Sequence, residues 1–405
     1  MNRIDRILVV GAGPVGTVAG LRLAQQGFHV TLFEQTPTAP EDHRAAALQP
    51  ASHAIFAQLG IIDEIERQGL RAQLYQWRDR LLGEVIADFD FGILKDVSEY
   101  PYVIQLEQHK TVNIALAEAS KYPNFNLVRP VEVLSVRQTA DEAIAEIRRE
   151  DGSIEVHNGA YLIGCDGGRS LVRKTMDVSF DGFTWEARQL IVTVDYDFEA
   201  AMNFRYRNFY THPVRSCSIF KVPGESGRGL WRSGIPVKHE ETDEEALSDA
   251  WISARLAECF PIGAPYRILH RTLYYAHNRV AGQFYLGRMI LAGDAAHLNN
   301  PNGAMGLNSG LQDAMNIADK LKEIREGGDN ETLLGRYDRQ RRLTAIEFVQ
   351  PQSIAGRKLM LESDPEKRRK GMDRLRRIVS DPVQHHDYLY KASLIAMQDR
   401  ANEIN

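Results

Sequence analysis

Unbroken runs of apolar residues, each followed by glycine and then by apolar positions at helical spacing, organise this chain. The first run is residues 7–10; "GAGPVG" follows at residues 11–16, and a helical pattern extends to Gly27. An apolar run without alternation is typical of a strand that is buried on both faces of a sheet. A second strand, residues 30–33, ends at Glu34. The pattern predicts a strand–helix–strand unit at the start of the chain.

The glycines of this unit have the spacing that a dinucleotide site requires. Gly11 permits a tight turn, Gly13 lets backbone amides approach a pyrophosphate, and Gly16 lets the helix pack close to the strand. The helix N-terminus presents free N–H groups to phosphates, and Glu34 can accept the hydroxyls of an adenosine ribose. Because Glu34 would repel a 2′-phosphate, the unit predicts FAD or NAD rather than NADP. The predicted contacts are Gly11, Gly13, Pro14, Val15, Gly16, Glu34 and Gln35.

Two further strand–turn–helix units follow later in the chain. "YLIGCDGGRSLVRK", residues 161–174, contains a strand, a turn at residues 166–168 and a helix that Ser170 can cap. "RMILAGDAAHLNNPNGAMGLNSGLQDA", residues 288–314, contains a strand, a turn at Gly293-Asp294, and a long run of small and polar residues before the next helix. Such a run allows backbone atoms to approach a ligand closely.

Together the three units resemble the single-component flavoprotein aromatic hydroxylases, the family of p-hydroxybenzoate hydroxylase. That family has a GxGxxG motif near its N-terminus, a DG motif in mid-chain and a GD motif in the last third. This chain has all three in that order, over most of residues 1–330. The resemblance implies an α/β fold (α+β overall): a Rossmann-like FAD-binding domain with an inserted antiparallel-sheet substrate domain and C-terminal helices.

The predicted domains alternate along the chain. Between residues 180 and 280, short alternating or β-branched runs are separated by turn residues, which is typical of an antiparallel sheet. "PEKRRKGMDRLRRIV" near the C-terminus is a basic helical face, for which a solvated surface helix is favoured over an interface or a membrane patch. The predicted boundaries are 1–73, 105–180 and 281–330 for the FAD-binding domain, 74–104 and 181–280 for the substrate domain, and 331–405 for the C-terminal helical region.

The resemblance also implies roles for single residues. Arg44 matches the family's arginine that reaches the cofactor, and Gln105 stands where the family often has another arginine. Asp166 and Gly167 belong to the DG motif, which touches FAD and helps NAD(P)H bind. Asp294 belongs to the GD motif, which binds the ribityl chain, and a carboxylate is an apt acceptor for sugar hydroxyls.

The loop after Asp294 is implied to lie against the isoalloxazine ring, although one proline and one glycine of the family pattern are replaced here. The positive N-terminus of the following helix would stabilise the reduced, anionic flavin. Pro301 would fix the loop and place its carbonyl by the reacting position of the substrate, and Asn308 would offer its amide to the flavin. The implied contacts are Pro301, Gly303, Gly306, Leu307 and Asn308.

Candidate substrate residues come from "NFRYRNFYTHPVR", residues 203–215, where arginines and aromatic residues suit an aromatic, anionic ligand. On an alternating strand, one face of such a run lines the pocket and the other does not. The sequence leaves the choice of face open. Tyr210, His212 and Arg215 are the candidates for catalytic contact, together with Pro301.

The resemblance implies hydroxylation of a small phenolic or heteroaromatic molecule by O2 and NADH or NADPH, through a flavin C4a-hydroperoxide. Three alternatives stay open. "WRSGIP", residues 231–236, resembles part of the WxWxIP segment of flavin-dependent halogenases, but Ser233 replaces the second tryptophan. An FAD-dependent reductase or sensor without oxygenation is the second. An NAD-binding dehydrogenase is the third, and it has no use for the glycine-rich loop.

Composition and residue spacing argue against several other classes of protein. The net charge of -5 over 405 residues argues against a nucleic-acid-binding protein. The cysteines, Cys165, Cys217 and Cys259, lack CxxC spacing and are expected to be free thiols, and the histidines do not cluster, so no metal is predicted. With no run of about 18 apolar residues, we expect a cytoplasmic protein without a membrane span. A homodimer is common among relatives of this kind.

Overall fold

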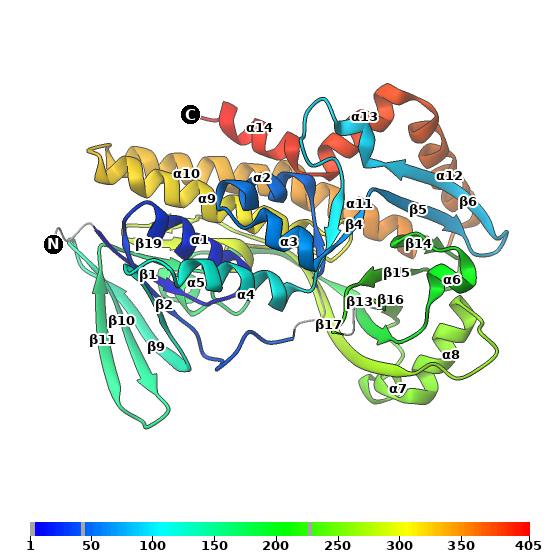
Figure 1. Ribbon diagram of the computed structural model, residues 1–405, viewed down its shortest axis with the longest axis horizontal. Helices are drawn as coiled ribbons and strands as arrows, with labels where there is room; N and C mark the ends of the chain where they lie inside the picture. The colour runs from blue at the N-terminus through cyan, green and yellow to red at the C-terminus, as the bar shows by residue number, and fades with distance from the viewer. Residues whose placement is uncertain (1–4, 42–44, 226–228) are drawn as a thin grey trace.

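The computed structural model describes residues 5–41, 45–225 and 229–405. Within these residues, two large sheets and two small ones are packed against helices (Figure 1). None of the helices in the described ranges combines the length and the apolarity that a bilayer crossing needs. The mixture of helix and sheet confirms the predicted fold class.

The predicted strand–helix–strand unit forms the centre of a sheet that we call the parallel sheet. Its described strands lie in the order β18-β19-β12-β1-β2-β8, and all neighbours except β18 and β19 are parallel. The three predicted units supply β1, β12 and β19, which are adjacent, so their glycine turns meet at one edge of the sheet. The bounds are β1 (Arg6–Val10), β2 (His29–Phe33), β8 (Phe125–Val128), β12 (Tyr161–Gly164), β18 (Tyr285–Leu286) and β19 (Met289–Leu291).

Helix α1 packs against both α4 and α9 beside this sheet (Figure 1). Pro14 is the first residue of α1, where its missing N–H leaves no helical hydrogen bond unmade. The apolar side chains of the parallel strands pack together with α9 and α10 in one core. The bounds are α1 (Pro14–Gln25), α4 (Gln108–Ala119), α5 (Leu171–Met176), α9 (Met305–Arg325) and α10 (Asn330–Thr344).

Two small sheets accompany the parallel sheet. One is antiparallel, in the order β11-β10-β9, and projects at the lower left of Figure 1. The other has the order β3-β7-β4, so β7 is central and carries Gln105 into the interior. The bounds are β3 (Ala47–Leu48), α2 (Pro50–Gln58), α3 (Ile62–Gln68), β4 (Leu70–Ala72), β7 (Val103–Gln105), β9 (Val131–Gln138), β10 (Ala143–Arg149) and β11 (Ile154–Gly159).

The second large sheet, which we call the mixed sheet, has the order β20-β17-β13-β16-β15-β14-β5-β6 among the described residues. Its neighbours are antiparallel except β14 and β5. β5 and β6 thus join strands that are more than 100 residues later in the chain. The bounds are β5 (Leu74–Asp79), β6 (Glu84–Asp90), β13 (Phe180–Val194), β14 (Arg207–Thr211), β15 (Cys217–Val222), β16 (Leu230–Val237), β17 (Ile268–Ala281) and β20 (His297–Leu298).

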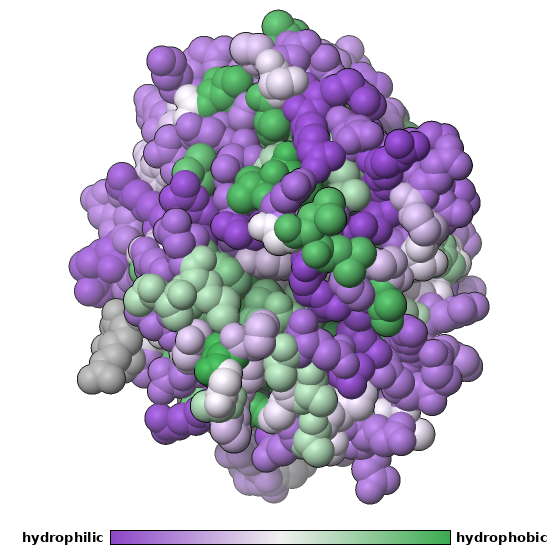
Figure 2. All heavy atoms as spheres, turned by 90° about the vertical axis from the view of Figure 1, so that its right-hand side faces the viewer, coloured by the Kyte–Doolittle hydropathy of each residue, from purple (hydrophilic) through white to green (hydrophobic). Residues whose placement is uncertain are grey.

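The two faces of the mixed sheet have different neighbours. One face packs against short helices around a core that contains Phe198, Trp231 and Phe260. The outer surface at this end of the molecule is mainly hydrophilic, with hydrophobic side chains gathered near its middle (Figure 2). The other face is turned towards the parallel sheet and α11, and it forms part of the cavity described below. The short helices are α6 (Phe198–Met202), α7 (Asp243–Leu247) and α8 (Asp249–Cys259).

The C-terminal region is helical, as predicted. Its basic helix, α12, packs one face against β6, and Arg368 of this helix forms an ion pair at 2.9 Å with Asp79 of the adjacent strand β5. The opposite face of α12 is exposed, so the helix is solvated on one side only. The remaining bounds are η2 (Phe91–Leu94), η3 (Gly293–Ala295), the π-helical η4 (Ala345–Val349), α11 (Gln350–Leu361), α12 (Pro365–Ser380), α13 (Pro382–Ala392) and α14 (Ile395–Glu403).

Candidate active site

A cavity of about 400 Å³ lies between the glycine edge of the parallel sheet and the inner face of the mixed sheet. All three predicted glycine motifs contribute to its wall, and so does the loop that precedes α9. The same cavity continues along β13, β14, β15, β16 and β17 to α11. One continuous space therefore joins the predicted cofactor motifs to the predicted substrate sheet.

The three glycines of the first motif have different surroundings. Gly11 has a φ of 97°, and a Cβ there would lie 2.5 Å from the carbonyl oxygen of Cys165. A Cβ on Gly16 would lie 2.0 Å from the carbonyl oxygen of Gly11. At Gly13, by contrast, a Cβ would meet nothing within 4 Å, and this residue lines the cavity. Gly11 and Gly16 are thus required by the fold, whereas Gly13 leaves space for a ligand.

The N-terminus of α1 opens onto this space. Gly13 is its N-cap and supplies no capping side chain, and Pro14 and Val15 also line the cavity. Backbone N–H groups at such an end favour a phosphate. The residues therefore fit a dinucleotide diphosphate.

Glu34 lies just past β2 and is tied to the same motif. Its carboxylate accepts hydrogen bonds from the backbone N–H of Ala12 at 2.8 Å and from the N–H and hydroxyl of Thr36 at 2.9 and 2.8 Å. These bonds hold the carboxylate beside the glycine turn. Gln35 is exposed, and Arg44 lies outside the described residues.

The two residues of the DG motif have different environments: the first makes hydrogen bonds within the protein, and the second lines the cavity. The Asp166 carboxylate accepts hydrogen bonds from the Ser170 hydroxyl at 2.6 Å and from the N–H of Leu171 at 2.7 Å, so it holds the start of α5. Gly167 has a φ of 76° and lines the cavity. Ser170 caps α5, as predicted, by accepting from the N–H of Arg173 at 2.9 Å. The predicted contact of Asp166 with the cofactor stays a prediction.

The GD motif packs directly on the first motif. A Cβ on Gly293 would lie 2.8 Å from the Val15 side chain, and a Cβ on Gly310 would lie 2.6 Å from it. Val15 therefore fits between two glycines from the third unit. This contact brings Asp294, which is exposed to the cavity, to the same space as Gly13.

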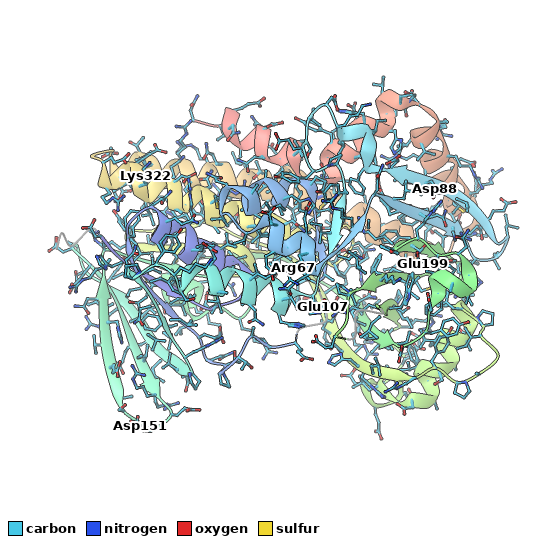
Figure 3. All side chains as sticks on the ribbon, viewed as in Figure 1. Arg67, Asp88, Glu107, Asp151, Glu199 and Lys322 are labelled. Carbon is cyan, nitrogen blue, oxygen red and sulfur yellow. The ribbon has the colours of Figure 1, made fainter. Side chains whose placement is uncertain are left out.

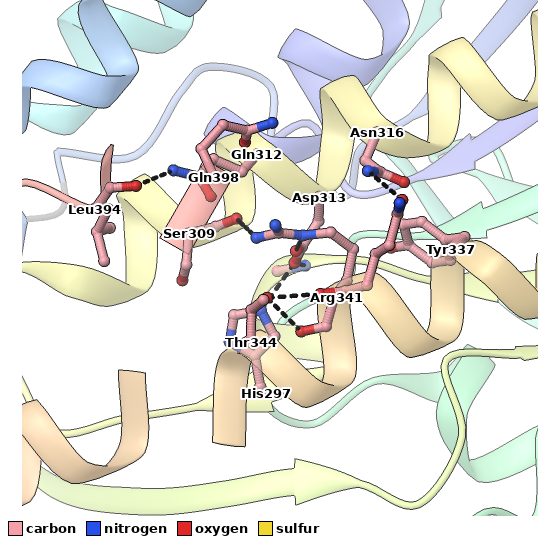
Figure 4. A network of polar contacts seen from close by, with 12 residues as sticks. His297, Ser309, Gln312, Asp313, Asn316, Tyr337, Arg341, Thr344, Leu394 and Gln398 are labelled. Carbon is pink, nitrogen blue, oxygen red and sulfur yellow. Dashed lines mark hydrogen bonds and ion pairs between the residues drawn. The ribbon is translucent and has the colours of Figure 1, made fainter. Parts of the chain in front are cut away.

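A buried network holds the GD turn in place (Figure 4). The Asp313 carboxylate, from α9, accepts hydrogen bonds from the backbone N–H of Gly293 at 3.0 Å, from His297 Nε2 at 2.8 Å and from Arg341 Nε at 2.7 Å. Burial acts to raise the pKa of Asp313, but His297 and Arg341 outweigh it and the pKa is lowered. This network was not predicted from the sequence, where Asp313 is simply an acidic residue within a predicted helix.

The loop before α9 lies along the cavity with small residues. Gly303 and Ala304 have φ values of 88° and 55°, and the Pro301 carbonyl accepts a hydrogen bond from the Ala304 N–H at 3.1 Å. Ala304 is the N-cap of α9 and gives no side-chain cap, so the positive end of that helix is open to the cavity. The predicted contacts Pro301, Gly303, Gly306 and Leu307 all line it.

Asn308 does not offer its side-chain amide to the cofactor, contrary to the prediction. Its amide is engaged within the protein: the side-chain oxygen accepts from the Gln49 N–H at 2.8 Å and the Ser52 hydroxyl at 2.7 Å. Its side-chain nitrogen donates to the carbonyls of Ala47 at 2.9 Å and Ala304 at 2.6 Å. Asn308 is fully buried and joins the α9 N-terminus to β3 and α2, and it has no amide N–H left for a ligand.

Gln105 remains available to a ligand. It is buried, it lines the cavity, and its side-chain oxygen has no hydrogen-bond partner among the described residues. A buried amide oxygen without a donor is costly unless a ligand supplies one. Near it, Glu107 accepts from the Gly224 N–H at 2.7 Å, where the parallel-sheet side of the molecule meets the mixed sheet (Figure 3).

Strands β13 to β16 present alternate residues to the cavity, and the predicted substrate residues are not among them. Tyr210 points to the opposite side, where its ring lies 5.2 Å from that of Phe260 and burial raises its pKa. Arg215 forms an ion pair with Glu241 at 2.7 Å, and neither it nor His212 lines the cavity. The residues that do line it on the mixed sheet are Gln189, Ile191, Arg207, Phe209, Ser218, Phe220, Val222, Arg232, Gly234, Pro236, Tyr274, Tyr275, Ala276 and His277.

The segment "WRSGIP" lies on β16, and its side chains alternate between the two faces of the mixed sheet. Trp231 is buried in the core behind the sheet, whereas Gly234 and Pro236 line the cavity. The tryptophan that suggested a halogenase therefore faces away from the candidate site. Helix α11 adds Arg357, Met360 and Leu361 to the cavity wall, and the sequence analysis had not assigned them a role.

Comparisons with known proteins agree with this geometry. The family described as "FAD binding domain" matches residues 5–352. Para-nitrophenol 4-monooxygenase from Pseudomonas sp. (strain WBC-3) is 33% identical over 91% of this chain and 90% of its own length. The crystal structure of p-nitrophenol 4-monooxygenase from Pseudomonas putida DLL-E4 has a TM-score of 0.90 at 28% identity and covers 99% of both chains.

A third relative is 6-hydroxy-3-succinoylpyridine 3-monooxygenase from Pseudomonas putida (strain DSM 28022 / S16), which is 28% identical over 87% of this chain and 88% of its own length. The chain belongs to the FAD-binding family of flavoprotein aromatic hydroxylases. It is an FAD-dependent aromatic monooxygenase, and NAD(P)H is the reductant typical of that family. These findings confirm the predicted class and do not support the halogenase and reductase alternatives.

Proposed function

We propose that this enzyme hydroxylates a small phenolic or heteroaromatic compound in the cavity, with FAD held at the glycine edge of the parallel sheet. The observation that carries the proposal is the continuity of the cavity. It runs from Gly13 at the α1 N-terminus, past the α9 N-terminus, to Phe209 and Phe220 on the mixed sheet. A cofactor and an aromatic ring can therefore meet in one continuous cavity.

Different residues are suited to different parts of the cofactor. We propose that Gly13 and the α1 N-terminus hold the diphosphate, Glu34 the adenosine ribose and Asp294 the ribityl chain. The open N-terminus of α9 would face the polar edge of the isoalloxazine ring, with Gln105 as a further polar contact. These assignments match the donors and acceptors found at each position: N–H groups for phosphate and carboxylates for hydroxyls.

When bound, FAD supplies the redox chemistry, taking hydride from NAD(P)H and activating O2. The chain itself has to orient the aromatic ring and keep water from the reacting atoms. The apolar side chains of Ile191, Phe209 and Phe220 and the small residue Gly234 form the part of the wall suited to a flat ring. Pro301, which lies in the loop at the cavity, would define the position of the reacting carbon.

We also propose the predicted division into an FAD-binding domain and an inserted substrate domain, because it follows the two large sheets. β5 and β6, from residues 74–90, belong to the mixed sheet with β13 to β17. The C-terminal helices lie against both sheets, and α11 reaches the cavity between them.

The experiment is to purify the protein, record its visible spectrum, and follow NADH and NADPH oxidation with a panel of phenols and hydroxypyridines. We expect a bound flavin spectrum, oxidation that accelerates only with certain ring compounds, and a product that carries one oxygen atom from O2. A flavoprotein whose NAD(P)H oxidation no aromatic compound accelerates would contradict the proposal. Incorporation of ¹⁸O from ¹⁸O2 distinguishes oxygenation from oxidation that only produces hydrogen peroxide.

A further inference from the structure

Several of the buried arginines that the structure describes face a carboxylate. Arg215 pairs with Glu241 at 2.7 Å, Arg341 with Asp313 at 2.7 Å and Arg368 with Asp79 at 2.9 Å. A buried guanidinium needs such compensation, since removing it from water is costly. Buried Arg173, which does not line the cavity, donates to the carbonyls of Ala295 and Gly168 instead. An arginine that is equally buried, lines the cavity and has no carboxylate partner is a site where a ligand can supply the missing negative charge.

Arg207 on β14 is one such residue. It is 4% exposed, forms no ion pair among the described residues, and has no hydrogen-bond partner for Nε or Nη1. Two aromatic rings lie beside it: the guanidinium is 5.3 Å from the Tyr75 ring centre and 6.0 Å from that of Phe91. Burial lowers the pKa of Arg207 to about 10, so the group is still charged at neutral pH.

Arg357 on α11 is the second. It is 1% exposed and donates to the side-chain oxygen of Gln189 at 3.2 Å and to the Ala187 carbonyl at 2.6 Å. Its guanidinium lies 5.1 Å from the Trp185 ring centre, and Nε has no hydrogen-bond partner in the described part of the chain. These partners are all neutral. Burial lowers its pKa to about 10, so this cation is also uncompensated at neutral pH.

Both arginines line the cavity, and they lie on different sides of it. Arg207 is on β14 and Gln189, to which Arg357 donates, is on β13; β16 and β15 separate the two strands. At strand spacing this is roughly 14 Å across the sheet. The wall between them includes Ile191 and Gly234, which are small or apolar. Of the described residues that line the cavity, Asp294 alone is a carboxylate, and it belongs to the cofactor end.

We propose that Arg207 and Arg357 bind oxygen anions on opposite sides of the aromatic substrate. The substrate class is then a phenol whose ring carries a second group with anionic oxygen atoms, such as a carboxylate. One guanidinium holds the phenolate form of the hydroxyl and the other holds the second group. The proposal rests on the proposed function, because it takes the cavity to be the aromatic site, and it adds the charge of the compound that fits there.

The test uses the FAD-loaded enzyme and two ring ligands that differ in charge but hardly in shape, benzoate and benzamide. Isothermal titration gives both dissociation constants for the wild type, Arg207→Gln, Arg357→Gln and the control Arg271→Gln. Arg271 is on β17 of the same sheet, does not line the cavity and pairs with Asp249 at 2.5 Å. We expect benzoate to bind at least about ten-fold more tightly than benzamide in the wild type and the control. Either cavity substitution reduces that ratio towards one.

Equal binding of the two ligands by the wild type, binding of neither, or an unchanged ratio in both cavity variants overturns the proposal. A second measurement covers loss of folding. Since Arg207 is an uncompensated buried charge, the holoenzyme of Arg207→Met without aromatic ligand should melt no lower than the wild type. By contrast, Arg215→Met leaves Glu241 without its ion-pair partner and should melt at a lower temperature. A lower melting temperature for Arg207→Met means that the arginine is compensated within the protein, which also overturns the proposal.

These measurements distinguish failure of the anion site from failure of the proposed function. The benzoate preference and its loss in Arg207→Gln concern binding alone and need no turnover. If the preference is found but no phenol accelerates NAD(P)H oxidation, the anion site stands and the hydroxylase assignment falls. If 4-nitrophenol or 4-hydroxybenzoate is hydroxylated without any charge preference in binding, the hydroxylase assignment stands and the anion site falls.

Discussion

Asp313 accepts a hydrogen bond from the backbone N–H of Gly293 at 3.0 Å and thereby connects α9 to the turn that presents Asp294. Two cations, His297 when protonated and Arg341, share the same carboxylate. The position of the cofactor turn thus depends on a helix that begins at the cavity and on a second helix, α10, that never reaches it (Figure 4).

Replacing Asp313 by asparagine should therefore destabilise the enzyme and loosen the cofactor. The change leaves Arg341 buried without its counter-ion, which costs about 3–5 kcal/mol in the free energy of unfolding. Urea unfolding of the apo and FAD-loaded forms measures it. The matched control is Asp319→Asn on the same helix, whose carboxylate pairs with Arg22 near the surface and should cost about 1 kcal/mol or less. Equal losses for the two variants would refute the assigned role of Asp313.

The glycines of the first motif should separate folding from cofactor binding. Gly16→Ala places a Cβ 2.0 Å from the Gly11 carbonyl oxygen and should destabilise the apo protein by about 1–3 kcal/mol. Gly13→Val meets open space in the cavity, so the apo protein should melt within a few degrees of the wild type. Its dissociation constant for FAD, measured by flavin fluorescence, should rise at least about ten-fold, because the side chain occupies the space proposed for the diphosphate. Unchanged FAD affinity in Gly13→Val would contradict that placement.

Phe209 and Tyr210 are adjacent on β14 and should respond oppositely to substitution. Phe209 lines the cavity and stacks on Trp77 at 4.8 Å, so Phe209→Ala should raise KM for the aromatic substrate by about ten-fold or more. The Tyr210 hydroxyl is buried with no partner in the described structure, so Tyr210→Phe should leave KM unchanged and not lower the melting temperature. Steady-state kinetics over a substrate series checks both. A raised KM in Tyr210→Phe alone would reverse the assignment of the faces.

His53 should make the stability depend on pH. It is fully buried on α2 beside the rings of Tyr100 and Tyr102, and burial lowers its pKa to about 3. The unfolded chain protonates near pH 6.5, so stability contributed by the neutral ring is present above that pH and is lost as the pH falls from 6.5 towards 3. The slope approaches about 1.4 kcal/mol per pH unit between pH 6 and 4. Urea unfolding at pH 7.5, 6 and 5 should show this slope, and His53→Gln should reduce it.

The control for this effect is His386→Gln, whose ring is partly exposed on α13 beside Asp96. It should leave the slope between pH 6 and 4 close to that of the wild type. If His53→Gln and His386→Gln have the same slope, then the buried ring is not the group that governs acid sensitivity in this range.

The sequence by itself determined the cofactor half of this protein. "GAGPVG" after an apolar run, the DG turn and the GD turn each specify a local backbone path. Glycines with φ values of 97°, 76° and 61° occur in the three turns, at Gly11, Gly167 and Gly293. Local sequence was enough to predict these strand–turn–helix units, and the family resemblance implied that their turns bind one cofactor. The structure places β1, β12 and β19 side by side.

Only the tertiary structure decided the substrate half. Alternation along β14 divides its side chains into two sets, but the sets are chemically alike: arginine and phenylalanine on one face, and asparagine and tyrosine on the other. Which set lines the cavity depends on which elements cover each face, here α8 behind the sheet and α11 in front of it. The prediction that Tyr210 contacts the substrate was wrong for that reason.

Tertiary packing also decides which of the buried arginines have a carboxylate partner. Arg207, Arg215 and Arg357 have no neighbouring sequence signal that shows which of them has a carboxylate partner. Folding places Glu241 beside Arg215 and places no described carboxylate beside Arg207 or Arg357. A charge pair across tens of residues is set by packing rather than by local propensity. The tertiary structure therefore determines which buried charges are balanced within the protein and which face the cavity.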